Sequence, residues 1–231
     1  MIRILLIFIF ISASAIADTC EGNIKDICIK AEKGDVIAQL VLGVAYESGN
    51  SVKQDYKKAI MWYEKAAIQG NANAQYSLGM MYGKGQGTKQ DYNKAFKWIK
   101  KSADQDFSDA QYTLGLIYMQ GQGVRQDEQK AFQLFKIAAE KGNSNAQYNL
   151  GVLYIIGGSV KQNYPEAIKW QMKSASQGNP LALYSIGVMY STGKILKQDK
   201  SKAKEFFGKV CDQGIQDGCN QYKLLNEQGV K

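Results

Sequence analysis

The chain has 231 residues, a formal net charge of +8 at pH 7, four cysteines and no histidine. Without histidine, a zinc site would need all four thiolates together, and the two cysteine pairs stand far apart in the sequence, so we expect no metal site. The positive charge permits an anionic partner such as a membrane surface or an acidic protein, but it also arises by chance in lysine-rich proteins, and we expect no nucleic-acid partner.

Residues 1–17 have the pattern of a secretory signal peptide. Arg3 precedes an unbroken apolar run from Ile4 to Ile11, and the segment ends in Ala15-Ile16-Ala17, an A-x-A cleavage pattern. The apolar run is shorter than the roughly 20 residues that a membrane-spanning helix needs. We therefore expect a periplasmic or secreted protein without a stable membrane anchor, whose cysteines form disulfides in an oxidising compartment.

A repeat of 36 residues fills most of the remaining sequence. The segments LGVAY, LGMMY, LGLIY, LGVLY and IGVMY recur in register, which is the signature of a repeat array. The five units begin at Ala38, Ala74, Ala110, Ala146 and Ala182, and a degenerate sixth begins at Gly218. The expected organisation is a capping helix in residues 18–37, five repeats in residues 38–217 and a C-terminal capping helix in residues 218–231.

Each unit reads as two helices. In the second unit, Ala74, Leu78 and Tyr82 form one apolar stripe at i, i+4 and i+8, and Gly85 ends that helix. A short polar residue can cap the second helix of each unit, at Asp55, Asp91, Asp127, Asn163 and Asp199. Glycine ends the second helix at Gly70, Gly142, Gly178 and Gly214. We expect an all-α protein, with Trp62, Trp98 and Trp170 in its core.

The recurring pattern resembles a known repeat family. L-G-x-x-Y, a G-x-G-type loop, D-Y-x-K-A, a tryptophan, A-A and G-N together are similar to the SEL-one-like repeat, a relative of the tetratricopeptide repeat. The resemblance covers about Cys28 to Gly229 and implies a right-handed α-solenoid of antiparallel helix pairs. Asp106 and Phe107 replace the usual Gly and Asn, although Asp tolerates a left-handed backbone better than most residues.

The repeat register gives the two cysteine pairs different settings. Cys211 falls at the end of a second helix and Cys219 in the first turn of the next, so a turn at Gly214 lets them bridge. This pair resembles those of the exported cysteine-rich branch of the family. A continuous helix would separate the Cα atoms of Cys20 and Cys28 by roughly 12 Å, too far for a disulfide. A helix with Asn23 as its N-cap would let Cys20 fold back.

The cysteine-rich relatives also raise an enzyme hypothesis, because some are linked to penicillin binding and β-lactam hydrolysis. Ser191-Thr192-Gly193-Lys194 fits the S-x-x-K pattern of such enzymes, but the sequence has no S-D-N or K-T-G. Ser191 also falls in what reads as the ordinary loop between two helices. We therefore expect no enzymatic activity, no catalytic residue and no cofactor.

One side of the first helices is the expected binding surface, since a solenoid's inner face is built from one side of each of these helices. This side carries the residues three, six and ten positions after each unit start: Val41, Val44, Ser48; Ser77, Met80, Lys84; Thr113, Leu116, Gln120; Asn149, Val152, Ile156; Ser185, Val188, Thr192. The middle position is apolar in all five units. Part of this apolarity serves packing between helices, but Ile155-Ile156 stands where the other units have Glu-Ser, Gly-Lys, Met-Gln or Ser-Thr.

The expected function is therefore that of an adaptor. Its predicted partner is a protein or peptide that lies along the first helices, contacting Met80, Lys84, Leu116, Gln120, Val152, Ile155, Ile156 and Val188. The family resemblance also allows an immunity protein that neutralises a secreted toxin. A basic series along one edge, Lys53, Lys89, Arg125, Lys161 and Lys197, reads as a solvated loop position. We expect a monomer.

Overall fold

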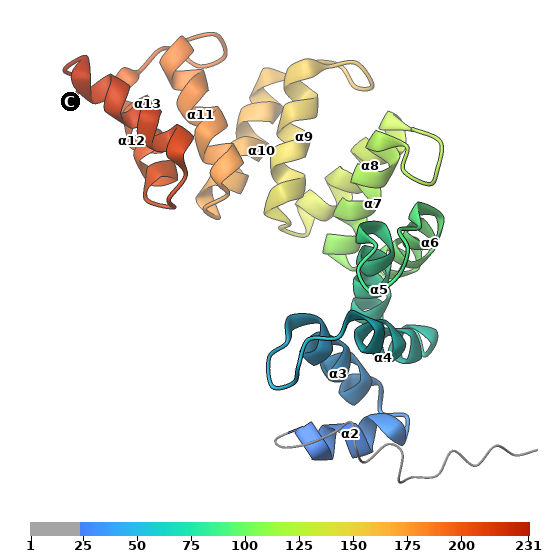
Figure 1. The fold of residues 1–231 in the computed structure, drawn as a ribbon. Helices are drawn as coiled ribbons and strands as arrows, with labels where there is room; N and C mark the ends of the chain where they lie inside the picture. Colours follow the sequence, from blue (N-terminus) through green and yellow to red (C-terminus); the bar gives the residue numbers. More distant parts are fainter. Residues whose placement is uncertain (1–23) are drawn as a thin grey trace, which may run out of the picture. The chain divides into compact units, whose positions relative to one another are not determined.

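The computed structural model of the chain describes residues 24–231, which form helices and connecting turns without a strand (Figure 1). The chain divides into two compact units, Met1–Asp91 and Tyr92–Lys231. The predicted all-α fold of paired helices is confirmed. The predicted signal peptide and Cys20 lie outside the described residues.

Within residues 24–91 the first unit contains four helices, α2 (Lys25–Glu32), α3 (Val36–Ser48), α4 (Tyr56–Ile68) and α5 (Ala72–Lys84), each packed against the next. Ile24 is the N-cap of α2 and makes no side-chain cap hydrogen bond. The predicted N-cap, Asn23, lies outside the described residues. The helix itself therefore begins within two residues of the expected position.

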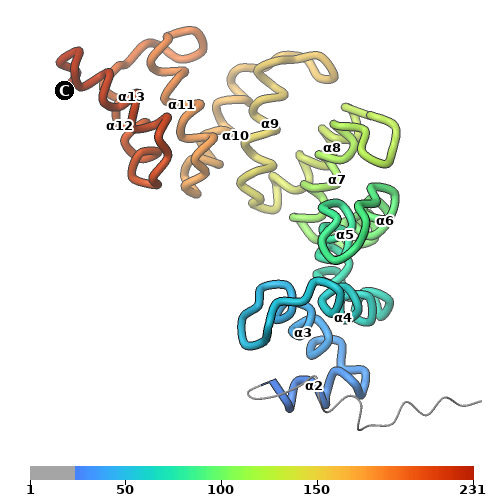
Figure 2. The backbone as a smooth tube through the Cα atoms, in the orientation of Figure 1, coloured from blue at the N-terminus to red at the C-terminus, as the bar shows by residue number. Residues whose placement is uncertain are grey.

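The second unit contains eight helices in two layers. Their bounds are α6 (Tyr92–Ala103), α7 (Ser108–Gln120), α8 (Glu128–Glu140), α9 (Ser144–Ile156), α10 (Tyr164–Ser176), α11 (Pro180–Thr192), α12 (Lys200–Cys211) and α13 (Gln216–Glu227). The first helices of the repeats, α7, α9, α11 and α13, form one layer, and the second helices, α6, α8, α10 and α12, form the other. Each second helix packs against the first helix that follows it, and α8, α10 and α12 also pack against the one before. The backbone trace in Figure 2 follows this alternation.

The predicted helix boundaries have the expected hydrogen bonds. Asp55, Asp127, Asn163 and Asp199 each accept a backbone N–H with their side chain at the start of a second helix. Gly142 has the predicted left-handed backbone, with φ of 94°. Asp106 adopts the same kind of backbone where the family has glycine, with φ of 66°. Its carboxylate accepts a hydrogen bond from Lys141, which holds the pKa of Asp106 below its usual value.

A buried hydrogen bond joins neighbouring repeats at four junctions. The Gln147 side chain donates from Nε2 to the backbone oxygen of Ala139, eight residues earlier, at 3.0 Å. Gln39, Gln75 and Gln111 make the corresponding bond. In the last junction the register places Cys219 at the glutamine position and Cys211 at the alanine position. A covalent bond therefore replaces the hydrogen bond between the end of one helix and the start of the next.

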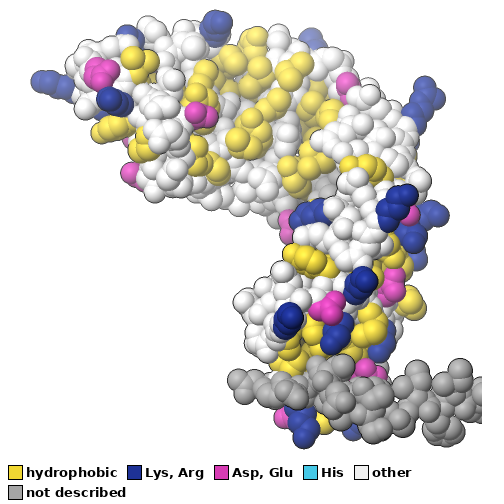
Figure 3. All heavy atoms as spheres, in the orientation of Figure 1, with side chains coloured by type: hydrophobic (Ala, Val, Ile, Leu, Met, Phe, Trp, Pro, Cys, Tyr) yellow, Lys and Arg dark blue, Asp and Glu magenta, His cyan; other side chains and the backbone are white. Residues whose placement is uncertain are grey.

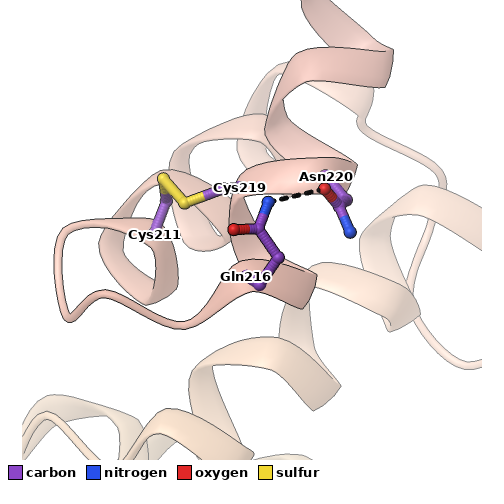
Figure 4. The surroundings of a disulfide bond; sticks show 4 residues. All are labelled: Cys211, Gln216, Cys219 and Asn220. Atoms are coloured by element: carbon purple, nitrogen blue, oxygen red, sulfur yellow. Dashed lines mark hydrogen bonds between the residues drawn. A yellow bond between two sulfur atoms is a disulfide. The ribbon is translucent and has the colours of Figure 1, made fainter.

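The predicted disulfide between Cys211 and Cys219 is confirmed, with their Cα atoms 4.5 Å apart (Figure 4). Beside it, Gln216 donates a hydrogen bond to Asn220 within the first turns of α13. Cys28 is buried and disulfide-bonded, and its partner lies outside the described residues. The disulfide at the C-terminal end thus closes the last turn between helices.

Three tryptophans occupy one repeat position on the second helices, but they are not equally buried. Trp62 and Trp170 are buried, as predicted. Trp98 is only half-buried, so its assignment to the core was wrong. Its ring lies under the ammonium group of Lys101, 4.5 Å from the ring centroid. A lysine also lies over the buried rings of Trp62 and Trp170, so the three positions share this contact and differ in burial.

Candidate protein-binding face

Three of the first helices of the second unit, α7, α9 and α11, present a surface with almost no charge. α7, α9 and α11 have 13 residues each, and Asp109 is their one charged residue. The chain as a whole has 29 Lys and Arg and 21 Asp and Glu, so the other segments carry nearly all of the charge. We call the exposed side of these three helices the first-helix face. It offers a partner apolar groups and neutral hydrogen-bonding groups.

The predicted contact residues of the second unit differ in how much of their side chain is exposed to solvent. Ile156 is 69% exposed and Val188 is 37% exposed, so both are available to a partner. Leu116 is half-buried because it packs against the core cluster that contains Phe132 and Phe135. The remaining predicted residues are Val152 and Ile155, which are half-buried, and Gln120, which is exposed. On the first-helix face, some of the predicted contact residues thus pack against the core and others are free to contact a partner.

Two predicted contact residues belong to the first unit. Met80 is half-buried on α5, and Lys84 is exposed at the end of the same helix. On α3, the residues at the corresponding side, Val41 and Val44, are both exposed. The first unit therefore has an apolar surface of its own on its first helices.

A groove of about 370 Å³ lies between α9, α11 and the start of α13. Its lining includes Tyr148 on α9, Leu181, Tyr184 and Val188 on α11, and Ile215 before α13. Leu181 is 56% exposed. Hydrophobic side chains gather over this part of the molecule in Figure 3. The groove is a mostly apolar recess, lined in part by Val188, one of the predicted contact residues, with Asp217 as its one charged lining residue.

Sequence reasoning missed this groove, although the repeat contained a signal for it. At the two preceding junctions a polar pair occupies the equivalent place: Asn143 donates to Asp109 at 2.7 Å, and Asn179 donates to Asn145 at 2.9 Å. At the next junction Ile215 replaces the asparagine and Leu181 replaces its acceptor. The loss of both polar partners together indicates that this junction became apolar.

Ser191, the serine of the S-x-x-K pattern, occupies an ordinary repeat position. It lies in the last turn of α11 and not in the loop, as the sequence had suggested. Its backbone oxygen accepts a hydrogen bond from Gln198 at 2.9 Å. The same bond recurs between Gln90 and Gly83 and between Gln162 and Ile155. Ser191 therefore takes part in a bond that closes the loop between paired helices in four of the repeats.

The buried tyrosine–carboxylate pairs of the first unit are part of its packing. The Tyr63 hydroxyl donates to Glu47 at 2.6 Å, and the Tyr82 hydroxyl donates to Glu64 at 2.8 Å. Burial, reinforced by Glu64, raises the pKa of Tyr82 to about 12. Within residues 24–231, no three His, Cys, Asp or Glu side chains are grouped so as to hold a metal ion. The helices of this range also include none with the length and apolar character to cross a membrane.

The family model of the Sel1 repeat matches five consecutive segments, residues 36–71, 72–107, 108–143, 144–179 and 180–215. The chain belongs to the Sel1 repeat family. Each matched segment begins two residues before the unit starts defined above, within the first turn of a first helix. A Sel1 repeat protein is a helical scaffold, usually for protein–protein interaction and generally without enzymatic activity.

Several solved structures resemble this chain. One is c5321, a protective antigen present in uropathogenic Escherichia coli strains that displays an SLR fold. It is 34% identical with a TM-score of 0.79, and the match covers 89% of this chain and 45% of that protein. This chain therefore spans less than half the length of the E. coli protein.

A Sel1 repeat protein from Oxalobacter formigenes is 28% identical, with a TM-score of 0.76, and the match covers 84% of this chain and 76% of that one. The immunity protein Pa5087 from Pseudomonas aeruginosa is 21% identical, with a TM-score of 0.56 and coverage of 86% and 79%. At that identity the likeness shows the fold alone. Among curated proteins, none matches this chain.

Proposed function

We propose that the protein is an exported adaptor that binds a segment of a protein or peptide partner along the first-helix face. The observation that carries this proposal is the near absence of charge on α7, α9 and α11 combined with the exposure of Ile156 and Val188. An apolar partner segment can cover this face without stripping water from charged side chains, which would be costly. We expect the adaptor to be a monomer.

Ile156 argues for binding more strongly than its neighbours because the repeat does not require it. Four other units have Ser48, Lys84, Gln120 and Thr192 at this position, and all of these are exposed. An isoleucine side chain here therefore adds apolar surface that the packing of the repeat does not use. Exposed apolar groups of this kind mark interaction surfaces when they lie in a larger apolar patch.

Export is supported by the sequence of residues 1–17 and by the Cys211–Cys219 disulfide, since disulfides persist in oxidising compartments. Recovery of the protein from the periplasm or medium, with an N-terminus at Asp18, would test this part of the proposal. An N-terminus at Met1 in a cytoplasmic fraction would contradict it.

The binding test uses peptides selected from a random display library on the immobilised protein. A double variant, Ile156→Asp with Val188→Asp, should lose affinity for the selected peptides by more than tenfold, because it places unpaired carboxylates in the contact surface. The control, Lys161→Glu with Lys197→Glu, changes the charge of two exposed loop positions and should bind as the wild type does. If the loop variant loses binding while the Asp variant keeps it, recognition lies on the loop edge and the proposed face is wrong.

The immunity alternative has a separate test. An immunity protein protects cells from one secreted toxin, so expression of the chain should rescue cells that carry a toxin gene from its own gene neighbourhood. Rescue that persists in the Ile156→Asp and Val188→Asp variant would assign neutralisation to another surface. Failure to rescue, with peptide binding intact, would leave the adaptor as the function.

A further inference from the structure

The two helix layers of the second unit differ sharply in charge. The second helices α6, α8, α10 and α12 carry 12 lysines and 4 glutamates. The first helices α7, α9, α11 and α13 carry one lysine and 3 acidic residues. The helices of one layer therefore sum to +8 (12 − 4) and those of the other to −2 (1 − 3). The cationic character of this unit is concentrated on one side.

Because the second helices form one layer against the first helices, their outward sides make up a common surface, which we call the second-helix face. The inward sides are fixed by buried residues such as Ala95 and Ile99 on α6. Lys97, Lys101, Lys136 and Lys173 point away from these buried stripes and are exposed. Within residues 24–231 none of these four lysines forms an ion pair, whereas Lys100, Lys169 and Lys209 each pair with a carboxylate on their own helix or the turn after it.

Aromatic side chains support lysines on this face at a fixed spacing. Lys101 lies over Trp98, and Lys173 lies over Trp170 at 4.4 Å from the ring centroid. In the third repeat the sequence has Leu134 and Ile137 instead of the aromatic residue and the lysine. The two positions thus change together, as expected if the ring supports the lysine side chain and leaves its charge at the surface.

Apolar side chains are exposed among these lysines. They include Ile137 on α8, Met172 on α10, and Tyr92 and Tyr164 at the starts of α6 and α10. Lysines combined with exposed aromatic and aliphatic groups are the composition that binds at the interface of an anionic membrane. A soluble polyanion would satisfy the lysines but would offer no apolar layer to Ile137 and Met172.

We propose that the second-helix face of residues 92–211 binds the surface of a bilayer that contains anionic phospholipids. The unpaired lysines contact the headgroup phosphates, and the exposed apolar side chains enter the boundary between headgroups and acyl chains. This peripheral binding is independent of a membrane-spanning helix. It uses the opposite layer from the first-helix face, so a protein partner and a membrane can be bound together.

The test is flotation of the full chain with vesicles of phosphatidylcholine containing 30% phosphatidylglycerol, compared with vesicles of phosphatidylcholine alone. We expect the protein to float with the anionic vesicles and to dissociate as salt is raised, because the attraction is screened. Replacing Lys97, Lys101, Lys136 and Lys173 by Ala should lower the affinity at least about tenfold. Replacing the same four by Arg, which keeps the charges, should preserve binding.

The matched control replaces four exposed cations of the loops, Arg125, Lys161, Lys194 and Lys197, by Ala. It removes the same net charge but leaves the second-helix face intact, so it should bind anionic vesicles as the wild type does. Equal losses of vesicle affinity in the two Ala variants would mean that binding depends only on the net charge of the protein, and would overturn the proposal. So would equal flotation with the two kinds of vesicle.

Tryptophan fluorescence gives a second measurement, because all three tryptophans of the chain stand on second helices. The emission of half-buried Trp98 should shift to shorter wavelength when anionic vesicles are added, and Trp98→Phe should lose most of this shift. Binding of a probe polyanion, a short DNA duplex, with no vesicle binding would replace the membrane by a soluble partner and contradict the proposal.

Discussion

The third and fourth repeats have the same helix pair but different cores at one equivalent position. In the third, the ring of Phe135 is buried against Gly115, where an added Cβ atom would lie 2.6 Å from the ring. In the fourth, Gln171 stands at that position against Gly151 and is fully buried. Neither amide atom of Gln171 has a hydrogen-bond partner among the described residues. One core is well packed and the other contains an unpaired polar group.

The repeats therefore contribute unequally to the stability of the fold. A buried amide without partners costs roughly 1–3 kcal/mol relative to a satisfied or apolar side chain. In a repeat array each unit contacts only its neighbours, so this cost is local to the fourth repeat. The same repeat carries the exposed Ile156 and the Gly157-Gly158 turn. We therefore expect local opening to begin there.

Giving the third repeat the core residue of the fourth should have the largest effect on stability. Phe135→Gln removes a buried aromatic ring and buries an amide in its place, so it should lower the free energy of unfolding by about 3–5 kcal/mol. Urea unfolding followed by circular dichroism measures this loss. A loss below about 1 kcal/mol would mean that the position tolerates an amide in every repeat, and the contrast with Gln171 would disappear.

The second largest loss of stability is expected where a larger side chain replaces a glycine at which two helices approach closely. Gly115→Leu forces the side chain into the Phe135 ring and should destabilise by about 3 kcal/mol through overpacking. At Gly151 an added Cβ atom would lie 2.5 Å from Cγ of Gln171, whose side chain has three rotatable bonds, and 3.1 Å from the Ala167 carbonyl oxygen. Because part of that contact can move away, the destabilisation by Gly151→Leu should be smaller. A larger loss for Gly151→Leu would contradict the view that the fourth repeat is the looser of the two.

Restoring the aromatic residue in the fourth repeat should be stabilising. Gln171→Phe removes the unpaired amide and places against Gly151 the ring that Gly115 and Gly187 already accommodate from Phe135 and Phe207. The free energy of unfolding should rise by about 1–3 kcal/mol. Hydrogen exchange should slow most in α9 and α10. If stability falls, the surroundings of Gln171 accommodate the amide better than a ring, and the fourth repeat is not the less stable of the two.

The features predicted correctly are those whose sequence pattern recurs in several repeats. The 36-residue period, the capping residues Asp55 and Asp127 and the left-handed glycines act through local backbone hydrogen bonds, so each repeat gives the same information. The Cys211–Cys219 disulfide followed from the same register, because it joins two helix ends separated by one turn.

The features that sequence reasoning missed depend on contacts between repeats or on solvent exposure. The groove beside Leu181 lies where Ile215 and Leu181 replace the polar pairs of the two preceding junctions. The replacement can be read in the sequence, but only the structure shows that the earlier residues pair. The repeat position that Trp98 shares with Trp62 and Trp170 predicts a core residue, whereas the Trp98 ring is only half-buried. Leu116 was chosen as a contact residue, yet much of its surface is used in packing.

The smallest effect on stability is expected at Ile156, and it separates the folding role of the fourth repeat from its binding role. Ile156→Asp alters a side chain that is 69% exposed, at the last position of α9, where the other repeats have polar residues. The free energy of unfolding should change by no more than about 0.5 kcal/mol. Binding of the selected peptides should nevertheless fall, because a carboxylate would be desolvated without a partner in the contact surface. Thermal unfolding and peptide titration of the same preparation measure the two effects together. A variant that loses stability by more than about 1 kcal/mol, with peptide affinity unchanged, would show that Ile156 serves packing in the fourth repeat and not recognition.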